Sequence, residues 1–133
     1  MDPVIHFQMP SEDNKRVANF YAQAFGWESK ELGPQMGDYM LVNTTKSDER
    51  DWSLTPGAIN GGFYKKVKPE NGTGIVIEVD DIHESMKKVT EAGGKVLGGM
   101  QSPTEPDDMP GVGFFVSILD TEGNNVGLMQ RHK

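Results

Sequence analysis

The stretch Val4-Ile-His-Phe-Gln-Met-Pro10, followed by Val17-Ala-Asn-Phe-Tyr-Ala-Gln-Ala-Phe-Gly-Trp27, decides the fold, because a fainter copy of it recurs later at a constant spacing. The matched positions are Asp13 with Asp81, Gly26 with Gly94, Phe7 with Ile75 and Met9 with Ile77. Two half-length copies of a strand–helix–strand pattern predict a pseudo-symmetric fold with a pocket within or between the halves. His6, a candidate metal ligand, falls opposite Gly74 in the second copy.

Composition limits the classes of protein to which the chain can belong. Its 133 residues suit one domain with a sizeable core, so we expect a single domain over residues 1–133. The absence of cysteine excludes disulfides, thiolate metal sites and cysteine nucleophiles. A formal net charge of −7 with scattered basic residues argues against nucleic acid as a partner. The sequence has no bilayer-spanning apolar run and an acidic start, so we expect a cytoplasmic protein that does not bind membranes.

The first half, residues 1–67, predicts strands around one amphipathic helix. Val4 to Met9 alternates with a period of two, and its odd-numbered residues are expected to face the helix. The helix is capped by Ser11 or Asp13 and ends at Gly26, since glycine takes the left-handed conformation without steric cost. Its predicted sheet-facing stripe consists of Val17, Phe20, Tyr21, Ala24 and Phe25. Further strands are predicted at 27–32, 38–44 and 58–67, with an exposed loop at 45–57.

The second half, residues 73–133, repeats this order after a linker at 68–72. A strand at 74–79 leads into a helix that begins at Asp81, with Glu84 placed as in a capping box, and ends at Gly93-Gly94. The predicted buried stripe of this helix is Ile82, Met86, Val89 and Ala92. Strands follow at 95–100, 112–119 and 125–129, with a loop at 102–111 and a tight turn at 120–123. Each half therefore reads βαβββ, an α+β fold.

Several motifs occur in the order in which small glyoxalase-like proteins carry them. They are Phe20-Tyr21…Phe25-Gly26-Trp27, Ile59 to Gly62, Ala92 to Val96, Pro110 to Phe115, and Asp120 to Asn124 with Gly127 to Met129. Through these motifs nearly the whole chain resembles the vicinal oxygen chelate superfamily of glyoxalase I, extradiol dioxygenases and bleomycin-resistance proteins. The resemblance implies two βαβββ modules, residues 1–67 and 73–133, whose curled mixed sheets form a cleft. It also implies a homodimer.

The resemblance further implies metal ligands at four cleft-facing positions, on the first and last strand of each half. At these positions the chain offers His6, then one of Asn60, Gly61 or Gly62, then Gly74 and Gly127. A divalent transition metal is held by three or four protein donors, and one imidazole does not supply them. We therefore expect no metal cofactor, which disfavours glyoxalase or dioxygenase chemistry at the usual site.

Four polar residues are candidates for contact with a ligand. His6 shares a strand face with Gln8, and it either contacts a ligand or transfers a proton, or it is a structural residue hydrogen-bonded to a neighbour. Gln8 and Asn60 either present amides to a ligand or bridge strands. Glu78 is the carboxylate nearest the inner face of the restarted strand, and thus the candidate partner of His6, unless its strand-end position leaves it exposed.

Three aromatic residues are candidates to line the cleft. Tyr39 either stacks on a ligand or packs within the sheet. Trp52 either closes the cleft, or docks its loop onto the body of the protein or a second chain. Phe114 and Phe115 point to opposite faces, so one joins the core and the other, assigned as Phe115, lines the cleft. The cleft glycines leave either an open cavity or a space that a neighbouring side chain fills.

Three functional hypotheses follow. The first is a metal-free glyoxalase-like protein that binds a small organic molecule, with antibiotic sequestration of the bleomycin-resistance type as one version. The second is an enzyme of lyase, isomerase or dioxygenase type that uses His6 as a general acid–base or as a metal ligand with unconventional partners. The third is a dimeric interaction module whose cleft is filled.

Overall fold

The computed structural model describes residues 1–68 and 72–132, which form two α-helices, a short 3-10 helix and nine strands. They group into two compact units: an N-terminal unit, His6–Thr73, and a C-terminal unit, Gly74–Lys133 together with Met1–Ile5. The predicted α+β class and repeated βαβββ order are confirmed, with one additional strand in the second repeat. Most of the predicted linker at 68–72 lies outside the described residues.

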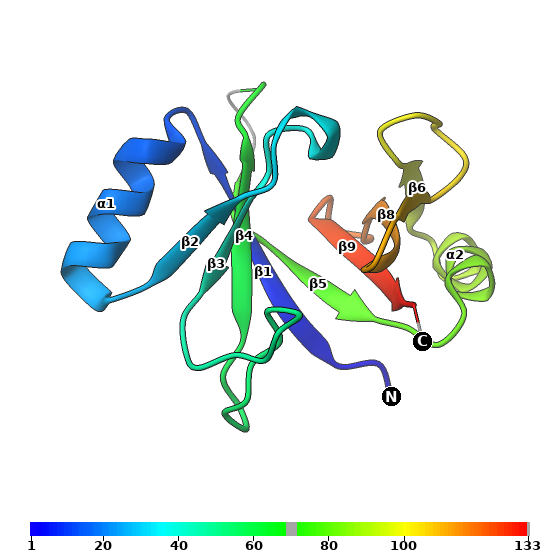
Figure 1. The fold of residues 1–133 in the computed structure, drawn as a ribbon. Helices are drawn as coiled ribbons and strands as arrows, with labels where there is room; N and C mark the ends of the chain where they lie inside the picture. Colours follow the sequence, from blue (N-terminus) through cyan, green and yellow to red (C-terminus); the bar gives the residue numbers. More distant parts are fainter. Residues whose placement is uncertain (69–71, 133) are drawn as a thin grey trace. The chain divides into compact units, whose positions relative to one another are not determined.

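The N-terminal unit contains a sheet of order β2-β3-β4-β1 with α1 beside it (Figure 1). Its elements are β1 (Val4–Ser11), α1 (Asn14–Phe25), β2 (Glu28–Glu31), the 3-10 helix Pro34–Met36, β3 (Met40–Asn43) and β4 (Asn60–Lys65). β1 and β4 are parallel, whereas β3 is antiparallel to both β2 and β4. Parallel neighbours cannot be joined by a tight hairpin, so the chain passes through α1, β2 and β3 before it returns beside β1.

α1 begins and ends where the sequence predicts. Asp13 is the N-cap, and its carboxylate accepts a hydrogen bond from the backbone N–H of Arg16 at 3.0 Å. Gly26 ends the helix in the left-handed conformation, with a φ of 76°, and its N–H donates to the carbonyl of Ala22 at 3.0 Å. The two caps satisfy backbone groups that a helix leaves unpaired at its ends.

The face of α1 that packs on the sheet is narrower than the predicted stripe. Val17, Ala18 and Tyr21 pack against a core formed by Met40, Val42 and Phe63. Phe20 and Phe25 are 57% and 65% exposed, and Ala24 is also exposed, so their prediction as buried residues is wrong. The packed residues belong to the first two turns of the helix, whereas Ala24 and Phe25 lie in its last turn. Phe20 and Phe25 instead join an aromatic cluster with Tyr21 and Trp27.

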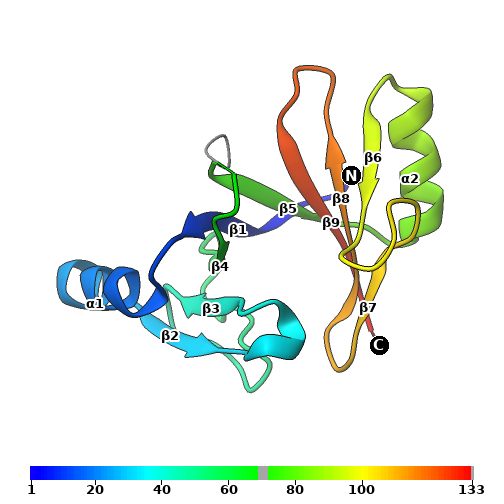
Figure 2. The same ribbon diagram turned by 90° about the horizontal axis from the view of Figure 1, so that it is seen from above.

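The C-terminal unit contains a sheet of order β5-β9-β8-β6, to which β7 adds by pairing with β8. Its elements are β5 (Gly74–Glu78), α2 (Ile82–Glu91), β6 (Lys95–Gly98), β7 (Asp107–Met109), β8 (Gly113–Leu119) and β9 (Asn125–Arg131). α2 runs along β6 (Figure 2). β7 lies inside the segment predicted as a loop at 102–111, so that prediction is wrong there. Pro106 and Pro110 flank this strand and leave its own backbone N–H groups free to pair.

The core of the C-terminal unit lies between α2 and one face of its sheet. Its buried residues are Val79, Ile82, Val116, Ile118, Val126 and Leu128, with Ile77, Met86, Val89, Val96 and Phe114 packed against them. Asp81 caps α2 by accepting a hydrogen bond from the N–H of Glu84 at 3.1 Å, as predicted. Ala92 is the C-cap and is exposed, so its assignment to the buried stripe is wrong. Within the described residues, neither α-helix has the length and apolar character that crossing a membrane would require.

Two phenylalanines test this account of the N-terminal core. Phe63→Ala removes a side chain that is 2% exposed and leaves a cavity in the core, so the free energy of unfolding should fall by about 3–5 kcal/mol. Phe20→Ala removes a ring that is mostly in water and should cost less than about 1 kcal/mol. Urea denaturation followed by circular dichroism measures both values. Equal losses in the two variants would show that the aromatic cluster on α1 is part of the core.

Candidate functional site

The register between β1 and β4 decides which residues share a face in the N-terminal unit. His6 lies opposite Asn60, and Gln8 lies opposite Gly62. Phe7 and Met9 point to the other face, as predicted: Met9 packs on the helix-side core, and Phe7 contacts Trp27 with ring centroids 5.6 Å apart. One face of this sheet therefore packs against α1. The opposite face, here called the polar face, carries His6, Gln8, Pro10, Glu28, Lys30, Tyr39, Leu41, Asn43, Asn60, Gly62 and Tyr64.

His6 is buried on the polar face and bonded to Tyr39. It is 9% exposed, and its Nε2 atom lies 2.9 Å from the Tyr39 hydroxyl. Burial lowers the pKa of His6 from 6.5 to about 4, because desolvation penalises the charged imidazolium. Burial also raises the pKa of Tyr39, and a hydrogen bond with the Gln8 side chain opposes this change only in part. At neutral pH the site is thus a neutral imidazole hydrogen-bonded to a neutral phenol.

The ring of Tyr39 fills the space that Gly62 leaves. A methyl group at position 62 would lie 2.2 Å from the Cε1 and Oη atoms of Tyr39, closer than real contacts allow. The hydroxyl end of the phenol therefore lies directly on the backbone of β4. Of the two outcomes that the sequence allowed at Gly62, an open cavity or a space filled by a neighbour, the structure shows the filled one.

Asn60, opposite His6, holds the loop between β3 and β4. Its Oδ1 accepts a hydrogen bond from the N–H of Thr44 at 2.8 Å. Its Nδ2 donates to Ser47 Oγ at 2.7 Å and to the carbonyl of Asp51 at 2.9 Å. Asn60 is 4% exposed, so these bonds satisfy a buried amide. These bonds favour the alternative in which the Asn60 side chain joins segments of the chain over the one in which it presents its amide to a ligand.

Trp52 lies in the same loop and is half-buried. Its backbone N–H donates to the carboxylate of Asp48 at 3.0 Å, and its carbonyl accepts from the N–H of Asp48 at 2.9 Å. These paired bonds close residues 48–52 into a compact turn. The loop is therefore an ordered part of the N-terminal unit, and Trp52 has a fixed place in it.

Glu78 and Phe115, the candidates from the second repeat, lie in the C-terminal unit. Glu78 forms a two-point ion pair with Arg131, one of whose hydrogen bonds measures 3.1 Å. The described hydrogen-bond partner of His6 is Tyr39, not Glu78. Phe114 packs against the core and Phe115 occupies the opposite face, as predicted. The Phe115 ring lies over Gly127, where an added methyl group would meet it at 2.6 Å.

The two aromatic–glycine contacts occupy equivalent places in the repeated modules. Leu41 of β3 lies opposite Gly62, and Tyr39 is two residues before Leu41. Ser117 of β8 lies opposite Gly127, and Phe115 is two residues before Ser117. In both units, therefore, a ring from the next-to-last strand or the turn just before it reaches diagonally across to a glycine of the last strand. Sequence reasoning missed this pairing because it depends on a register that alternation alone does not give.

The donor set on the polar face does not fit a divalent metal ion. His6 is the one imidazole there, and its Nε2 is engaged by Tyr39. Gly61 points to the opposite face and Gly62 has no donor. Within residues 1–68 and 72–132, no group of three or more histidine, cysteine, aspartate or glutamate side chains is arranged to hold a metal. Such ions require three or four protein donors.

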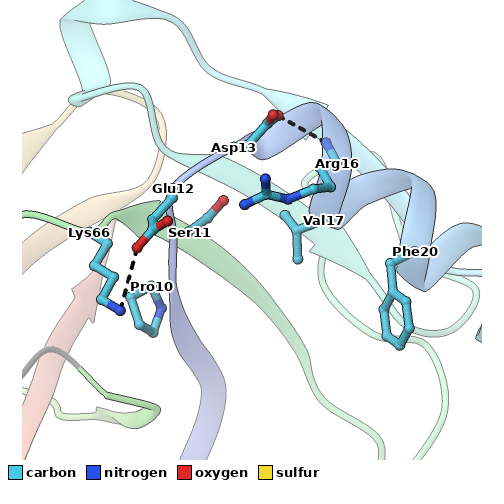
Figure 3. A pocket seen from close by; sticks show the side chains of 8 residues that line it. All are labelled: Pro10, Ser11, Glu12, Asp13, Arg16, Val17, Phe20 and Lys66. Carbon is cyan, nitrogen blue, oxygen red and sulfur yellow. Dashed lines mark hydrogen bonds and ion pairs between the residues drawn. The ribbon is translucent and has the colours of Figure 1, made fainter. Parts of the chain in front are cut away.

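A separate surface hollow of about 460 Å³ lies where β1 leads into α1 (Figure 3). Glu12 pairs with Lys66 at 3.6 Å, and Asp13 is occupied as the helix cap. With Arg16 as the second base, two acids and two bases line the hollow, so it has no net charge with which to select an ion. The hydroxyl of Ser11 is buried there without a hydrogen-bond partner in the described part of the chain.

A second hollow, of about 430 Å³, lies beside Glu78 and Arg131 in the C-terminal unit. Neither hollow is lined by His6 or Tyr39. Of the residues that the sequence singled out, His6, Gln8, Tyr39 and Asn60 come together on the polar face of the N-terminal sheet, where Tyr39 occupies the space over Gly62.

Comparison with known proteins identifies the family. No protein-family model matches the chain. A protein of Didymella fabae described as a "Glyoxylase-like domain-containing protein" is 31% identical over 128 residues, which cover 93% of this chain and 90% of that protein. The chain belongs to the glyoxalase-like proteins. The resemblance to the vicinal oxygen chelate superfamily that the motifs carried is therefore confirmed.

Solved structures share the fold of this glyoxalase-like protein at low sequence identity. A methylmalonyl-CoA epimerase has a TM-score of 0.68 at 17% identity, covering 98% of this chain and 95% of that one. The Streptomyces coelicolor epimerase in complex with 2-nitronate-propionyl-CoA has a TM-score of 0.69 at 14% identity, covering 98% and 97%. A glyoxalase/bleomycin resistance protein/dioxygenase superfamily member from Vibrio splendidus has a TM-score of 0.62 at 13% identity, covering 98% and 99%. At these identities the likeness concerns the fold alone.

The buried neutral state of His6 makes stability depend on pH. The folded pKa of about 4 lies below the ordinary value of 6.5, so the unfolded chain binds a proton at higher pH. The free energy of unfolding should be highest above pH 6.5 and should fall as the pH is lowered through 4, by up to about 3 kcal/mol from this group. His6→Gln should remove this loss of stability at low pH. His83→Gln, which changes an exposed residue of α2, should retain it. Urea unfolding across this pH range measures the difference, and identical profiles for both variants would contradict it.

The unpartnered hydroxyl of Ser11 gives a second stability prediction. Ser11→Ala removes a buried polar group that has no bond to lose, so the free energy of unfolding should rise by about 1 kcal/mol. Thr44→Val is the matched control, because the Thr44 hydroxyl donates to the carbonyl of Ile59 at 2.7 Å and its loss should destabilise. Thermal or urea unfolding compares the two. A loss of stability in Ser11→Ala would show that its hydroxyl is bonded in solution.

Proposed function

We propose that this glyoxalase-like protein binds a small, uncharged organic molecule on the polar face of its N-terminal sheet, without the metal ion typical of the superfamily. The observation that carries the proposal is the 2.9 Å contact between His6 Nε2 and the Tyr39 hydroxyl, in which a phenol stands where a metal would bind the imidazole. His6 then acts as a neutral hydrogen-bonding group that orients a polar group of the ligand.

The side chains of the polar face support an uncharged ligand. Next to His6 this face carries amide, hydroxyl and imidazole groups, and His6 is neutral because its pKa is about 4. The charged residues assigned to the face, Glu28 and Lys30, lie on β2, which β3 and β4 separate from β1. A charged ligand group would lose its hydration there without an opposite charge to compensate, which costs several kcal/mol. Amide, hydroxyl and imidazole groups instead match the carbonyl, hydroxyl or amide groups of a neutral molecule.

The acid–base hypothesis is limited to one role for His6, that of a base. A histidine with a pKa of about 4 is deprotonated at neutral pH, so it can accept a proton but holds none to donate from an imidazolium. Any catalysis through His6 would then begin with proton abstraction. Antibiotic sequestration is one version of ligand binding, and the neutral groups around His6 favour a neutral drug.

The binding proposal includes the homodimer that the superfamily resemblance implies and the expected cytoplasmic location. The structural neighbours show that this fold accommodates small-molecule ligands, since one was solved with 2-nitronate-propionyl-CoA. Light scattering coupled to size-exclusion chromatography measures the molar mass of the protein, which should be that of two chains. This measurement needs no ligand.

A fragment screen on the tag-free protein tests the proposal. Nitrogen-15 HSQC spectra with neutral carbonyl, amide and hydroxyl compounds should show shifts concentrated at residues 6–8, 39–43 and 60–64. His6→Gln should weaken binding of a hit by about tenfold, the value of a buried hydrogen bond with its unpaired partner, and His83→Gln should not.

Metal analysis of the same purified samples completes the test. We expect less than stoichiometric Ni, Zn, Mn or Fe in the wild type, and no thermal stabilisation when these ions are added. Stoichiometric metal that disappears in His6→Gln, or a screen without a single shift on the polar face, would overturn the proposed function.

A further inference from the structure

We infer that His6, Gln8 and Gly62 form a hydroxyaryl-binding niche, which Tyr39 occupies as an internal stand-in for a phenolic ligand. The inference rests on the proposed function, because it places the ligand on the same polar face. It goes further by naming the chemical class of the ligand and the residue that must move to admit it.

The contacts of Tyr39 define what the niche recognises. The phenolic oxygen lies 2.9 Å from His6 Nε2 and is also hydrogen-bonded by Gln8. The Cε1, Cζ and Oη atoms all approach the position of a Gly62 side chain to within 2.3 Å, so the hydroxyl end of the ring lies flat against bare backbone. The niche therefore supplies two hydrogen-bonding groups and a surface without side-chain bulk, which fit a hydroxyl attached to a planar ring.

Tyr39 lies at the end of a strand. It comes just before β3, which begins at Met40, and follows a turn in which Asp38 has a φ of 58°. Its carbonyl accepts a hydrogen bond from the N–H of Leu32 at 2.9 Å, and movement of its side chain alone leaves this bond in place. A left-handed conformation is uncommon for a residue other than glycine and marks a sharply turned backbone. Phe115, the equivalent ring in the C-terminal unit, instead lies inside β8 and is paired with β7 on one side and β9 on the other.

The chemistry of the two equivalent niches differs in one respect. Departure of the Tyr39 ring leaves His6 and Gln8 without their shared partner, and a buried polar group left unpaired is costly. A ligand hydroxyl restores that partner, whereas a ring without a hydroxyl does not. The Phe115 ring lies over Gly127, and a methyl group of Val76 lies beside the same glycine. A ring should therefore be held there by packing, with no preference for a hydroxyl.

Removal of the internal ring tests the inference directly. In Tyr39→Gly, p-cresol has the shape of the deleted side chain and should raise the melting temperature, while toluene, which lacks the hydroxyl, should bind about tenfold more weakly or not at all. Phe115→Gly is the matched control, in which toluene should bind at least as well as p-cresol. Circular dichroism first establishes that each variant is folded. Equal binding of p-cresol and toluene to Tyr39→Gly, or no binding to the folded variant, would overturn the niche.

A measurement on the wild type covers the case in which Tyr39→Gly does not fold. Carbon-13 labelling of the tyrosine rings gives resonances for all three tyrosines, and Tyr39→Phe identifies the one from Tyr39. Saturating p-cresol should shift the Tyr39 resonance and leave that of Tyr21, in the helix-side core, unchanged. A Tyr39 resonance unmoved by p-cresol would contradict the inference.

The outcomes separate this inference from the proposed function. If neutral fragments without a hydroxyaryl group shift the polar face while p-cresol does not, the proposed function stands and the hydroxyaryl niche fails. If p-cresol and every other fragment leave the polar face unshifted in the wild type, the proposed function fails as well.

Discussion

The parallel pairing of the first and last strands in each unit is the constraint on which the rest of the structure depends. Because parallel neighbours cannot be joined by a hairpin, each module needs a long crossover between them, which here contains a helix and two or three strands. The pairing also fixes the register, and the register decides which residues share a face. His6 comes to lie opposite Asn60, and Gln8 opposite Gly62, through this pairing.

Those shared faces separate the residues around His6 from the helix-side cores. Gly62 and Gly127 carry no side chain, and the aromatic rings of Tyr39 and Phe115 occupy the space beside them. His6 retains a partner, but that partner is a neutral phenol rather than a cation. The helix-side cores include none of these residues, so the fold does not depend on the chemistry of the site.

Sequence reasoning found the features that are local and missed those that depend on register. The Asp13 cap, the Gly26 stop and the opposite faces of Phe114 and Phe115 follow from rules that span a few residues, and the structure confirms them. The contact between His6 and Tyr39 joins residues 33 positions apart, so no local pattern reveals it. Two errors, the buried assignment of Phe20 and Phe25 and the missed strand β7, arose where tertiary packing overrides an intrinsic preference.

The glycines of β4 have a consequence for how this protein can evolve. Gly61 and Gly62 are adjacent, and β4 is clasped between the Phe7 ring on one side and the Tyr39 ring on the other. A larger side chain at position 62 alone would collide with the Tyr39 ring, so a single substitution there would harm the fold. The two positions are therefore coupled: a side chain at 62 is tolerated only where the residue at 39 is smaller.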